Sequence, residues 1–261
     1  MKFISFPYSD FSVSKVSFGT SSLYKSFSKK AAFSILSDAV DLGISHFDTS
    51  PMYGEGLSEK LLGRFLSSNV SNITVASKVG LFPHISHPNI FNVSLFKLFK
   101  KFKLLSYREK VDFSISAINS TIENSLRVLN RDVIDIVFLH EPMIDLIDFK
   151  EVYDVLNGHV QKGNVSYFGL AGEPYNLAEF SHCDLTDFFI QTRAFPSNDF
   201  ISFTHEIARQ SNFVYGLFKD CSDNELSHRL SFLNTSCIDS SIIVSSSKRS
   251  NLEYLINEIS S

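Results

Sequence analysis

Residues 43–63 read GISHFDTSPMYGEGLSEKLLG, and this stretch decides the class of fold. Mixed apolar and polar residues over 44–48 predict a short strand, and the Thr-Ser-Pro that follows ends regular structure. Apolar residues at helical spacing over 57–66 then predict a helix. The stretch is therefore a strand-loop-helix unit, with Asp48 and Tyr53 in the segment that leaves the strand.

The same alternation of strand and helix patterns continues along the chain. A helix predicted over 29–42 stops at Gly43, because glycine readily adopts the left-handed conformation found at helix ends. Further strands are predicted at 72–78, 133–139, 165–170, 188–191, 213–215 and 241–244. Further helices are predicted at 113–129, 149–156, 200–209 and 252–259. Such alternation is typical of an α/β protein with a parallel sheet, either doubly wound or closed as a barrel.

Two absent motifs favour the barrel. The chain has neither the Gly-x-Gly-x-x-Gly fingerprint of dinucleotide-binding doubly wound folds nor a phosphate-binding loop. We therefore predict a (β/α)8 TIM barrel with a short N-terminal β-hairpin, forming one domain over residues 1–261. Functional groups of such barrels lie at strand ends, and the predicted strands end at Asp48, Lys78, His140 and Gln191.

Composition narrows the class of protein. The 261 residues are 44% hydrophobic with a formal net charge of -4, which suits one large core and disfavours nucleic-acid binding. The N-terminal residues lack a signal-peptide pattern, and no run approaches the roughly 20 apolar residues of a membrane span. We therefore expect a soluble, cytoplasmic protein. Cys183, Cys221 and Cys237 lack metal-type spacing, so we expect reduced thiols and no metal site.

Four residues together suggest proton transfer, although each alone has a structural explanation. Asp48 at a strand end suits a helix cap or turn, and Tyr53 and His140 suit ordinary packing. Lys78 ends an apolar strand, where a long cation needs a carboxylate partner. Tyrosine has a solution pKa of about 10 and donates protons usefully near neutrality when an adjacent cation stabilises its phenolate. Together the four predict a proton-donating site.

These residues resemble the signature of the aldo-keto reductase family. Residues 43–63 are similar to the family's glycine-to-aspartate-to-tyrosine motif, in which tyrosine follows aspartate by five positions. Residues 77–80, SKVG, resemble its lysine strand, and residues 135–142, DIVFLHEP, its histidine strand. The resemblance covers most of the chain. It implies a barrel that binds a nicotinamide nucleotide in extended form without a glycine-rich fingerprint.

The resemblance implies a role for each catalytic residue. Tyr53 would be the general acid for carbonyl reduction, or the base for alcohol oxidation. Lys78 would lower the pKa of the tyrosine, and Asp48 would hold Lys78. His140 would position the substrate oxygen, while the cofactor carries the hydride.

The resemblance also implies a cofactor site. Gln191 resembles the glutamine that binds the nicotinamide carboxamide, and Tyr215 resembles the aromatic residue that stacks on the nicotinamide ring. Where the family binds the adenosine 2′-phosphate, this chain has Ser245, Ser246, Ser247, Lys248 and Arg249. The two basic residues favour NADP(H) over NAD(H). Ordinary burial, or solvation of a surface basic pair, is the alternative explanation of these residues.

Three segments depart from the family pattern. The Gly-Val-Ser-Asn expected after the fifth strand reads Gly-Leu-Ala171-Gly172, so a hydroxyl and an amide expected against the carboxamide are missing. Segment 219–241 is short, which implies a more exposed nucleotide site. The stretch 81–110 interleaves apolar residues with lysines. We expect it to form either part of the substrate wall or an amphipathic surface segment, and its charge also suits an anionic substrate or membrane surface.

We therefore expect an NAD(P)(H)-dependent oxidoreductase that interconverts a carbonyl and an alcohol. The motifs DTSPMYGEGLSE and KVGL look more like aldose dehydrogenases of the galactose and fucose type than steroid reductases, which favours a sugar or sugar derivative as substrate. The alternative is a catalytically weak nucleotide-binding or regulatory barrel, like the potassium-channel β subunits of this family. An isomerase or lyase on the same barrel would need metal-ligand or phosphate-binding features that are not evident here.

Overall fold

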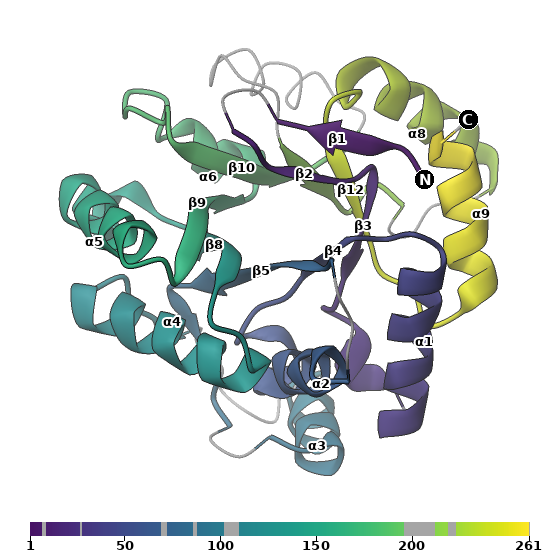
Figure 1. Cartoon of the computed structure of the whole chain (residues 1–261), viewed down its shortest axis with the longest axis horizontal. Helices are drawn as coiled ribbons and strands as arrows, with labels where there is room; N and C mark the ends of the chain where they lie inside the picture. The colour runs from purple at the N-terminus through teal and green to yellow at the C-terminus, as the bar shows by residue number, and fades with distance from the viewer. Residues whose placement is uncertain are drawn as a thin grey trace.

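The protein is a closed barrel of parallel strands in the computed structural model (Figure 1), which describes residues 1–6, 9–26, 28–68, 72–85, 88–101, 110–195, 212–218 and 223–260. Around the barrel the strands are β3(Val16–Gly19), β4(His46–Asp48), β5(Thr74–Val79), β8(Ile134–His140), β9(Val165–Gly172), β10(Phe188–Arg193), β11(Phe213–Tyr215) and β12(Ser241–Val244). β12 pairs with β3 and closes the barrel. The closure confirms the predicted (β/α)8 class over the doubly wound alternative.

Helices surround the barrel (Figure 1). They are α1(Lys29–Asp41), α2(Leu57–Leu66), α3(Ile90–Lys101), α4(Ile115–Leu129), α5(Phe149–Gln161), α6(Pro174–Ala178), α8(Asp223–Ser236) and α9(Arg249–Ser260). Single 3-10 turns are η1(Leu23–Lys25), η2(Tyr53–Gly56) and η3(Ile144–Leu146). The main core lies between barrel and helices, with Phe18, Phe47 and Leu62 among its fully buried side chains.

Local capping explains where several predicted helices begin. Ser28, Ser114 and Asp148 accept hydrogen bonds from backbone N–H groups in the first turns of α1, α4 and α5. α5 runs five residues beyond its predicted end, and α9 begins three residues before its predicted start. Neither α8 nor β3 was predicted as a separate element, because α8 is predominantly polar and β3 belongs to the alternating N-terminal run. The helix predicted over 200–209 lies outside the described residues.

A hairpin closes the amino-terminal end of the barrel. β1(Phe3–Ser5) pairs antiparallel with β2(Ser12–Ser14), which confirms the predicted N-terminal hairpin. Phe6, beside the hairpin, meets the rings of Phe189 and Phe213 at 5.4 and 5.1 Å between centroids. Phe189 and Phe213 lie at the starts of their strands. The hairpin therefore seals this end with aromatic side chains, and the opposite end carries the polar ones.

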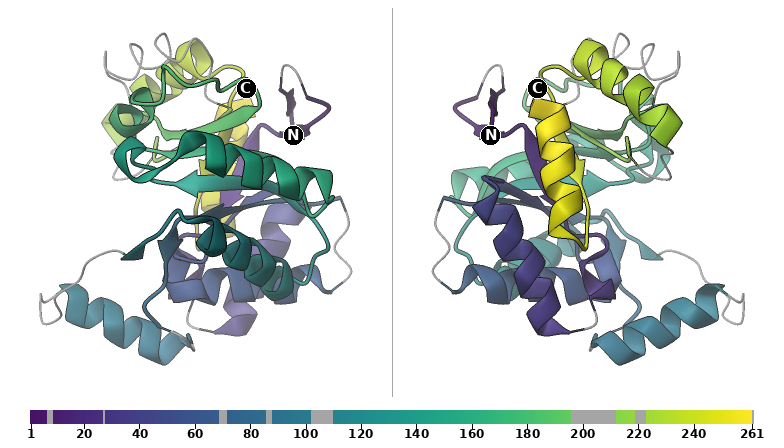
Figure 2. Two further views of the ribbon diagram at one scale, coloured as in Figure 1. Left: turned by 90° about the vertical axis from the view of Figure 1, so that its left-hand side faces the viewer. Right: turned by 90° about the vertical axis from the view of Figure 1, so that its right-hand side faces the viewer.

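The stretch after β5 forms a separate excursion. β6(Leu81–Phe82) and β7(Lys110–Val111) pair antiparallel, and α3 between them stands away from the barrel in Figure 2. α3 buries Val93 fully and leaves Phe91 78% exposed. Its described part therefore fits an amphipathic surface segment better than a wall of the barrel. Among the described residues, no helix is long and apolar enough to cross a membrane.

Candidate active site

An Asp-Lys ion pair lies at the carboxyl end of the barrel. Asp48 ends β4, Lys78 is the penultimate residue of β5, and each is 3% exposed. The Lys78 ammonium donates to Asp48 Oδ1 and to the backbone oxygen of Thr49, the latter at 3.1 Å. Burial lowers the pKa of Lys78, while the Asp48 carboxylate acts in the opposite direction. Two buried groups of opposite charge therefore satisfy one another, as the strand-end pattern predicted.

The loop after β4 directs Tyr53 back over this pair. Its hydroxyl donates to Asp48 Oδ2 at 3.4 Å, and its ring centroid lies 5.0 Å from the Lys78 ammonium nitrogen. Three successive residues with positive φ, Gly54, Glu55 and Gly56, make this tight reversal. A Cβ on Gly54 would collide with the side chain of Tyr24. Glycine at 54 is therefore required for both the backbone conformation and the close approach.

Tyr53 is a protonated phenol in this geometry. Burial raises its pKa well above the ordinary value, and the nearby Asp48 charge raises it further. The Lys78 ammonium contacts the face of the Tyr53 ring, and the structure records no hydrogen bond between these two described side chains. The arrangement thus supplies a proton donor. The cation lies against the face of the tyrosine ring, whereas the family resemblance implied that it acts on the hydroxyl.

His140 ends β8 beside Tyr53. The two rings meet edge to face, with centroids 5.9 Å apart, and His140 Nδ1 lies 3.3 Å from the hydroxyl oxygen of Ser50. Burial, followed by the Lys78 charge, lowers the His140 pKa to about 3, so the imidazole is neutral at pH 7. When Ser50 donates to Nδ1, the other ring nitrogen carries the proton and can donate to a substrate oxygen. Ser50 was missed by sequence reasoning, although its position between Asp48 and Tyr53 was a usable signal.

The structure brings Gln191 to the same centre. It lies on β10, is 2% exposed, and donates through Nε2 to Asp48 Oδ1 at 2.7 Å. Its amide oxygen is buried without a hydrogen-bond partner in the described part of the chain. A buried acceptor of this kind costs free energy unless a ligand donor satisfies it. The amide group of a nicotinamide carboxamide is such a donor, so Gln191 fits the cofactor role that the resemblance implied.

Tyr215 lies at the end of β11, and its hydroxyl donates to Glu141 Oε1 at 3.5 Å. Burial, followed by the Glu141 charge, raises its pKa. Its ring is held at the carboxyl end of the barrel next to β10, because Tyr215 pairs in register with Arg193. This position is compatible with stacking on a ligand ring. Glu141 was not singled out from the sequence.

Of the predicted 2′-phosphate residues, Arg249 is the first residue of α9, and the others lie in the loop between β12 and α9. Ser245 donates to the backbone oxygen of Gly19 at 2.7 Å, and Ser246 bonds both backbone groups of Lys248. The Arg249 guanidinium pairs with the carboxylates of Asp38, at 3.0 Å, and Glu253, at 2.8 Å. Ser247 and Lys248 are exposed. Within the described residues Lys248 has no ion pair, so it is the cation of this loop that remains open to an anion.

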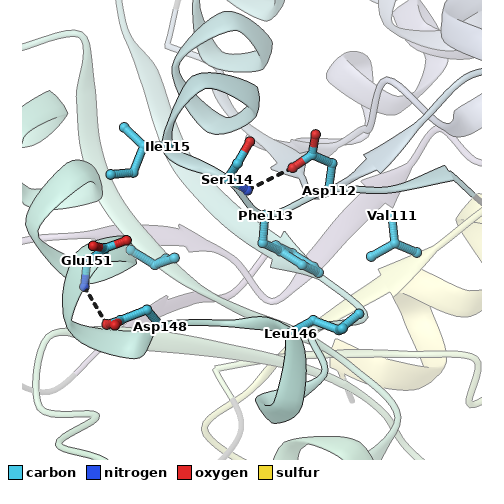
Figure 3. Close-up of a pocket in the computed structure, with 9 residues that line it drawn as sticks. Val111, Asp112, Phe113, Ser114, Ile115, Leu146, Asp148 and Glu151 are labelled. Carbon is cyan, nitrogen blue, oxygen red and sulfur yellow. Dashed lines mark hydrogen bonds between the residues drawn. The ribbon is translucent and has the colours of Figure 1, made fainter.

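Two cavities lie in the described part of the protein. One, of about 360 Å³, lies where α4 and α5 begin (Figure 3). Two of its carboxylates are bound by backbone donors: Asp112 accepts from the Ser114 N–H at 2.9 Å, and Asp148, the cap of α5, accepts from the Glu151 N–H at 3.1 Å. The other, of about 410 Å³, is lined by Glu173, Pro174, Tyr175, Arg193 and Phe195 beyond the ends of β9 and β10. Among the described residues, no group of acidic, histidine or cysteine side chains could hold a metal ion.

Comparison with known proteins identifies the family. The aldo/keto reductase family profile matches residues 15–187. The fold is a closed (β/α)8 barrel, and its polar centre, a buried Asp-Lys pair under a tyrosine, lies at the carboxyl ends of the strands. The chain belongs to the aldo/keto reductase family.

Two relatives have the names of sugar dehydrogenases. The chain is 31% identical over 173 residues to L-galactose dehydrogenase of Arabidopsis thaliana, covering 63% of this chain and 46% of that enzyme. It is 33% identical over 130 residues to D-threo-aldose 1-dehydrogenase of a Pseudomonas species, covering 46% of this chain and 36% of that enzyme. The matched region thus spans less than half of each relative.

Solved structures show the same fold. A putative aldo-keto reductase of Pseudomonas aeruginosa superposes with a TM-score of 0.76 at 20% identity, covering 96% of this chain and 91% of that one. The holo form of an aldo-keto reductase of Bacillus halodurans has a TM-score of 0.75 at 20% identity, covering 100% and 91%. At this identity the likeness extends to the fold alone.

Proposed function

We propose that the chain is an NAD(P)(H)-dependent oxidoreductase that interconverts a carbonyl and an alcohol on a small molecule. The observation that carries the proposal is that Tyr53 and Lys78 both bind Asp48, while His140 packs against Tyr53 from another strand. A proton donor, a cation and a neutral imidazole within one cluster are what carbonyl reduction requires from the protein.

The division of labour follows from the protonation states. A bound nicotinamide would supply or accept the hydride. Tyr53, which is protonated across the neutral range, donates the proton to the oxygen of the reduced carbonyl. Neutral His140 orients that oxygen by donating a hydrogen bond, and the Lys78 ammonium stabilises negative charge that develops on the oxygen. Asp48 holds Lys78 and Gln191. Gln191 and Tyr215 would hold the nicotinamide of a bound cofactor.

We propose a sugar or a sugar derivative as the substrate. The support is the pair of relatives whose names are those of aldose-type dehydrogenases, together with the matching DTSPMYGEGLSE motif. We further propose NADP(H) as the preferred cofactor, because Lys248 has no ion pair within the described chain and can pair with a 2′-phosphate. One domain over residues 1–261 and a cytoplasmic location stay predictions from the sequence.

A catalytically weak nucleotide-binding or regulatory barrel is the second candidate. Two observations favour it: the Lys78 ammonium faces the ring of Tyr53, and Ala171 and Gly172 replace the hydroxyl and amide of the family pattern. Cofactor titration separates binding from turnover, and a substrate panel then separates the two candidates.

The test is a fluorescence titration of the purified chain with NADPH and with NADH, followed by a panel of carbonyls and aldoses in both reaction directions. We expect saturable binding, tighter for NADPH, and turnover of at least one aldose. Binding without turnover of any compound in the panel would favour the regulatory candidate. Absence of binding for both nucleotides would overturn the proposed function.

A further inference from the structure

Glu141 holds an unusual position at the mouth of the site. It follows His140 directly and has a φ of +49°, in the left-handed region that non-glycine residues rarely adopt. Its backbone N–H donates to the Ala171 oxygen at 2.7 Å, which continues the pairing of β8 with β9 by one residue. This turn directs the side chain across the end of β9 and towards β11.

Three donors hold the Glu141 carboxylate there. Oε2 accepts from the Glu173 backbone N–H at 3.2 Å, and Oε1 accepts from the Tyr215 hydroxyl at 3.5 Å. The side chain of Asn176 is a further hydrogen-bond donor. Burial raises the pKa of Glu141 and the Glu173 charge raises it further, whereas these hydrogen bonds act in the opposite direction by stabilising the ionised form. The carboxylate is therefore held in place by groups that favour its negative charge.

Gly172 makes room for this carboxylate. A Cβ at position 172 would lie 3.0 Å from Glu141 Oε2 and 3.5 Å from its Cα. A longer side chain, such as the asparagine of the family pattern, would extend further into the same space. The inward position of Glu141 thus depends on the small residue at 172, where this chain departs from the family pattern. The place of a neutral amide is taken by an anion.

The charges at the mouth do not cancel. Asp48 and Lys78 neutralise one another, His140 is neutral at pH 7, and Arg193 pairs with Glu173 at 3.5 Å. Glu141 has no ion pair among the described residues. Its charge also reaches the reacting groups, because it raises the pKa values of Tyr53 and Lys78. Among the described residues, one net negative charge therefore remains beside the catalytic centre.

We propose that Glu141 makes the site select the oxidised form of the nicotinamide cofactor over the reduced form. This inference rests on the proposed function. The nicotinamide ring carries a positive charge when oxidised and none when reduced, so a fixed carboxylate in a poorly solvated site stabilises one form only. Charge pairs in such partly buried surroundings change an affinity ratio by about tenfold. The site is thereby biased towards alcohol oxidation, the direction in which the oxidised cofactor must bind.

The experiment compares dissociation constants of NADP+ and NADPH at pH 7, by calorimetry and by fluorescence. Glu141→Gln keeps the shape of the side chain and removes the charge. We expect it to weaken NADP+ binding about tenfold and to leave NADPH binding within about twofold. The matched control is Glu179→Gln, which removes the same charge from an exposed position just after α6 and should leave the ratio unchanged.

A second variant keeps the inference testable if Glu141→Gln does not fold. Gly172→Ala leaves every charge in place but pushes the Glu141 carboxylate aside, and we expect a smaller loss of the NADP+ preference. If both forms of the cofactor weaken equally in Glu141→Gln and Gly172→Ala, or neither does, the role of Glu141 is overturned while the proposed function stands. If the wild-type chain binds neither form, the proposed function and this inference are overturned together.

Discussion

The two ends of the barrel each bury a lysine, with different consequences. At the amino-terminal end Lys15, 5% exposed, donates to the backbone oxygens of Cys237, Ile238 and Ser240 at 2.7 to 2.9 Å. These oxygens follow α8, so Lys15 ties that helix end to the strand next to it. At the carboxyl end Lys78 donates to a carboxylate that also contacts Tyr53. Lys15 thus donates only to backbone oxygens, which cannot exchange protons, whereas Lys78 donates to a carboxylate that also accepts from the Tyr53 hydroxyl.

A histidine also lies at each end, His46 fully buried and His140 half-buried. His46 lies under the hairpin, stacked on Phe213 at 4.9 Å between centroids, with Nδ1 2.8 Å from the hydroxyl of Thr74. Burial, followed by the Lys78 charge, lowers the pKa of His46 to about 3, the same value as for His140. A shifted pKa therefore does not distinguish the two histidines. Access from the open end and the neighbouring Tyr53 distinguish them, which is why we assign the chemistry to that end alone.

The largest expected effect is that of Tyr53→Phe. It removes the proton donor and keeps the ring that packs against His140, so turnover should fall by about 10²- to 10⁴-fold while cofactor affinity changes little. Steady-state kinetics on a substrate that the wild-type chain turns over, together with cofactor titration, measure both quantities. Wild-type turnover in this variant would show that the assignment of the tetrad is wrong.

Lys78→Met and Lys15→Met compare the two lysines directly. Lys78→Met should lower turnover to a similar degree as Tyr53→Phe, and the double variant should be no slower than the slower single one, because both changes act on one proton. Lys15→Met should leave turnover at 25 °C unchanged but lower the free energy of unfolding by about 1 to 3 kcal/mol, since three carbonyls lose their donor. Kinetics and chemical denaturation measure these effects. A loss of turnover in well-folded Lys15→Met would contradict the comparison.

The pH dependence of stability sharpens the Lys15 assignment. Burial lowers the pKa of Lys15 from 10.5 to about 8, so the unfolded chain binds its proton more tightly than the folded chain does. The free energy of unfolding of the wild type, relative to Lys15→Met, should therefore rise between pH 8 and pH 10.5. Denaturation curves at several pH values in this window test the sign, and a fall with increasing pH would show that the ammonium is not buried.

Lys248→Ala and Arg249→Ala compare two neighbouring cations, one without and one with carboxylate partners in the described chain. Arg249 is occupied by Asp38 and Glu253, whereas Lys248 has no ion pair in the described chain. We expect Lys248→Ala to weaken NADPH about fivefold to tenfold relative to NADH, and Arg249→Ala to change this preference by less than about twofold. Titration of each variant with both nucleotides provides the measurement. A larger effect for Arg249→Ala would mean that the phosphate displaces the two carboxylates.

The smallest expected effect is that of His46→Leu. The side chain is enclosed by aromatic rings and has an unpaired Nε2 within the described structure, so an apolar residue of similar size should be accepted. Turnover should stay within about twofold and the free energy of unfolding within about 1 kcal/mol of the wild type. A loss of turnover like that of Tyr53→Phe would show that the closed end takes part in the chemistry.

Local sequence patterns predicted most of the regular structure. α2 was predicted with its observed bounds, and the strand ends at Asp48 and His140 were also correct. Each of these depends on neighbours within a few positions: the helical spacing of apolar residues, and the change to polar residues where a strand leaves the core. α8 was missed for the same reason, because little apolar periodicity marks it.

The sequence singled out candidate site residues that the structure brings together, but it did not predict all of their partners. Motif spacing indicated Tyr53, Lys78 and His140. It did not predict that the Lys78 ammonium lies over the face of the Tyr53 ring, because this contact depends on how η2 turns the chain back over β5. The pairing of Arg249 with Asp38 joins residues 211 positions apart. No local pattern encodes such a distance.

The sequence by itself thus determined the order of strands and helices, the (β/α)8 class and the residue types of the site, because these depend on periodicity and on short motifs. Only the tertiary structure decided which buried cation faces a proton donor, which is satisfied by backbone oxygens, and that Glu141 fills the space left by Gly172. Those outcomes depend on closure of the barrel, which brings the ends of separate strands within hydrogen-bonding distance. The energies of buried charges depend on these neighbours and not on position along the chain.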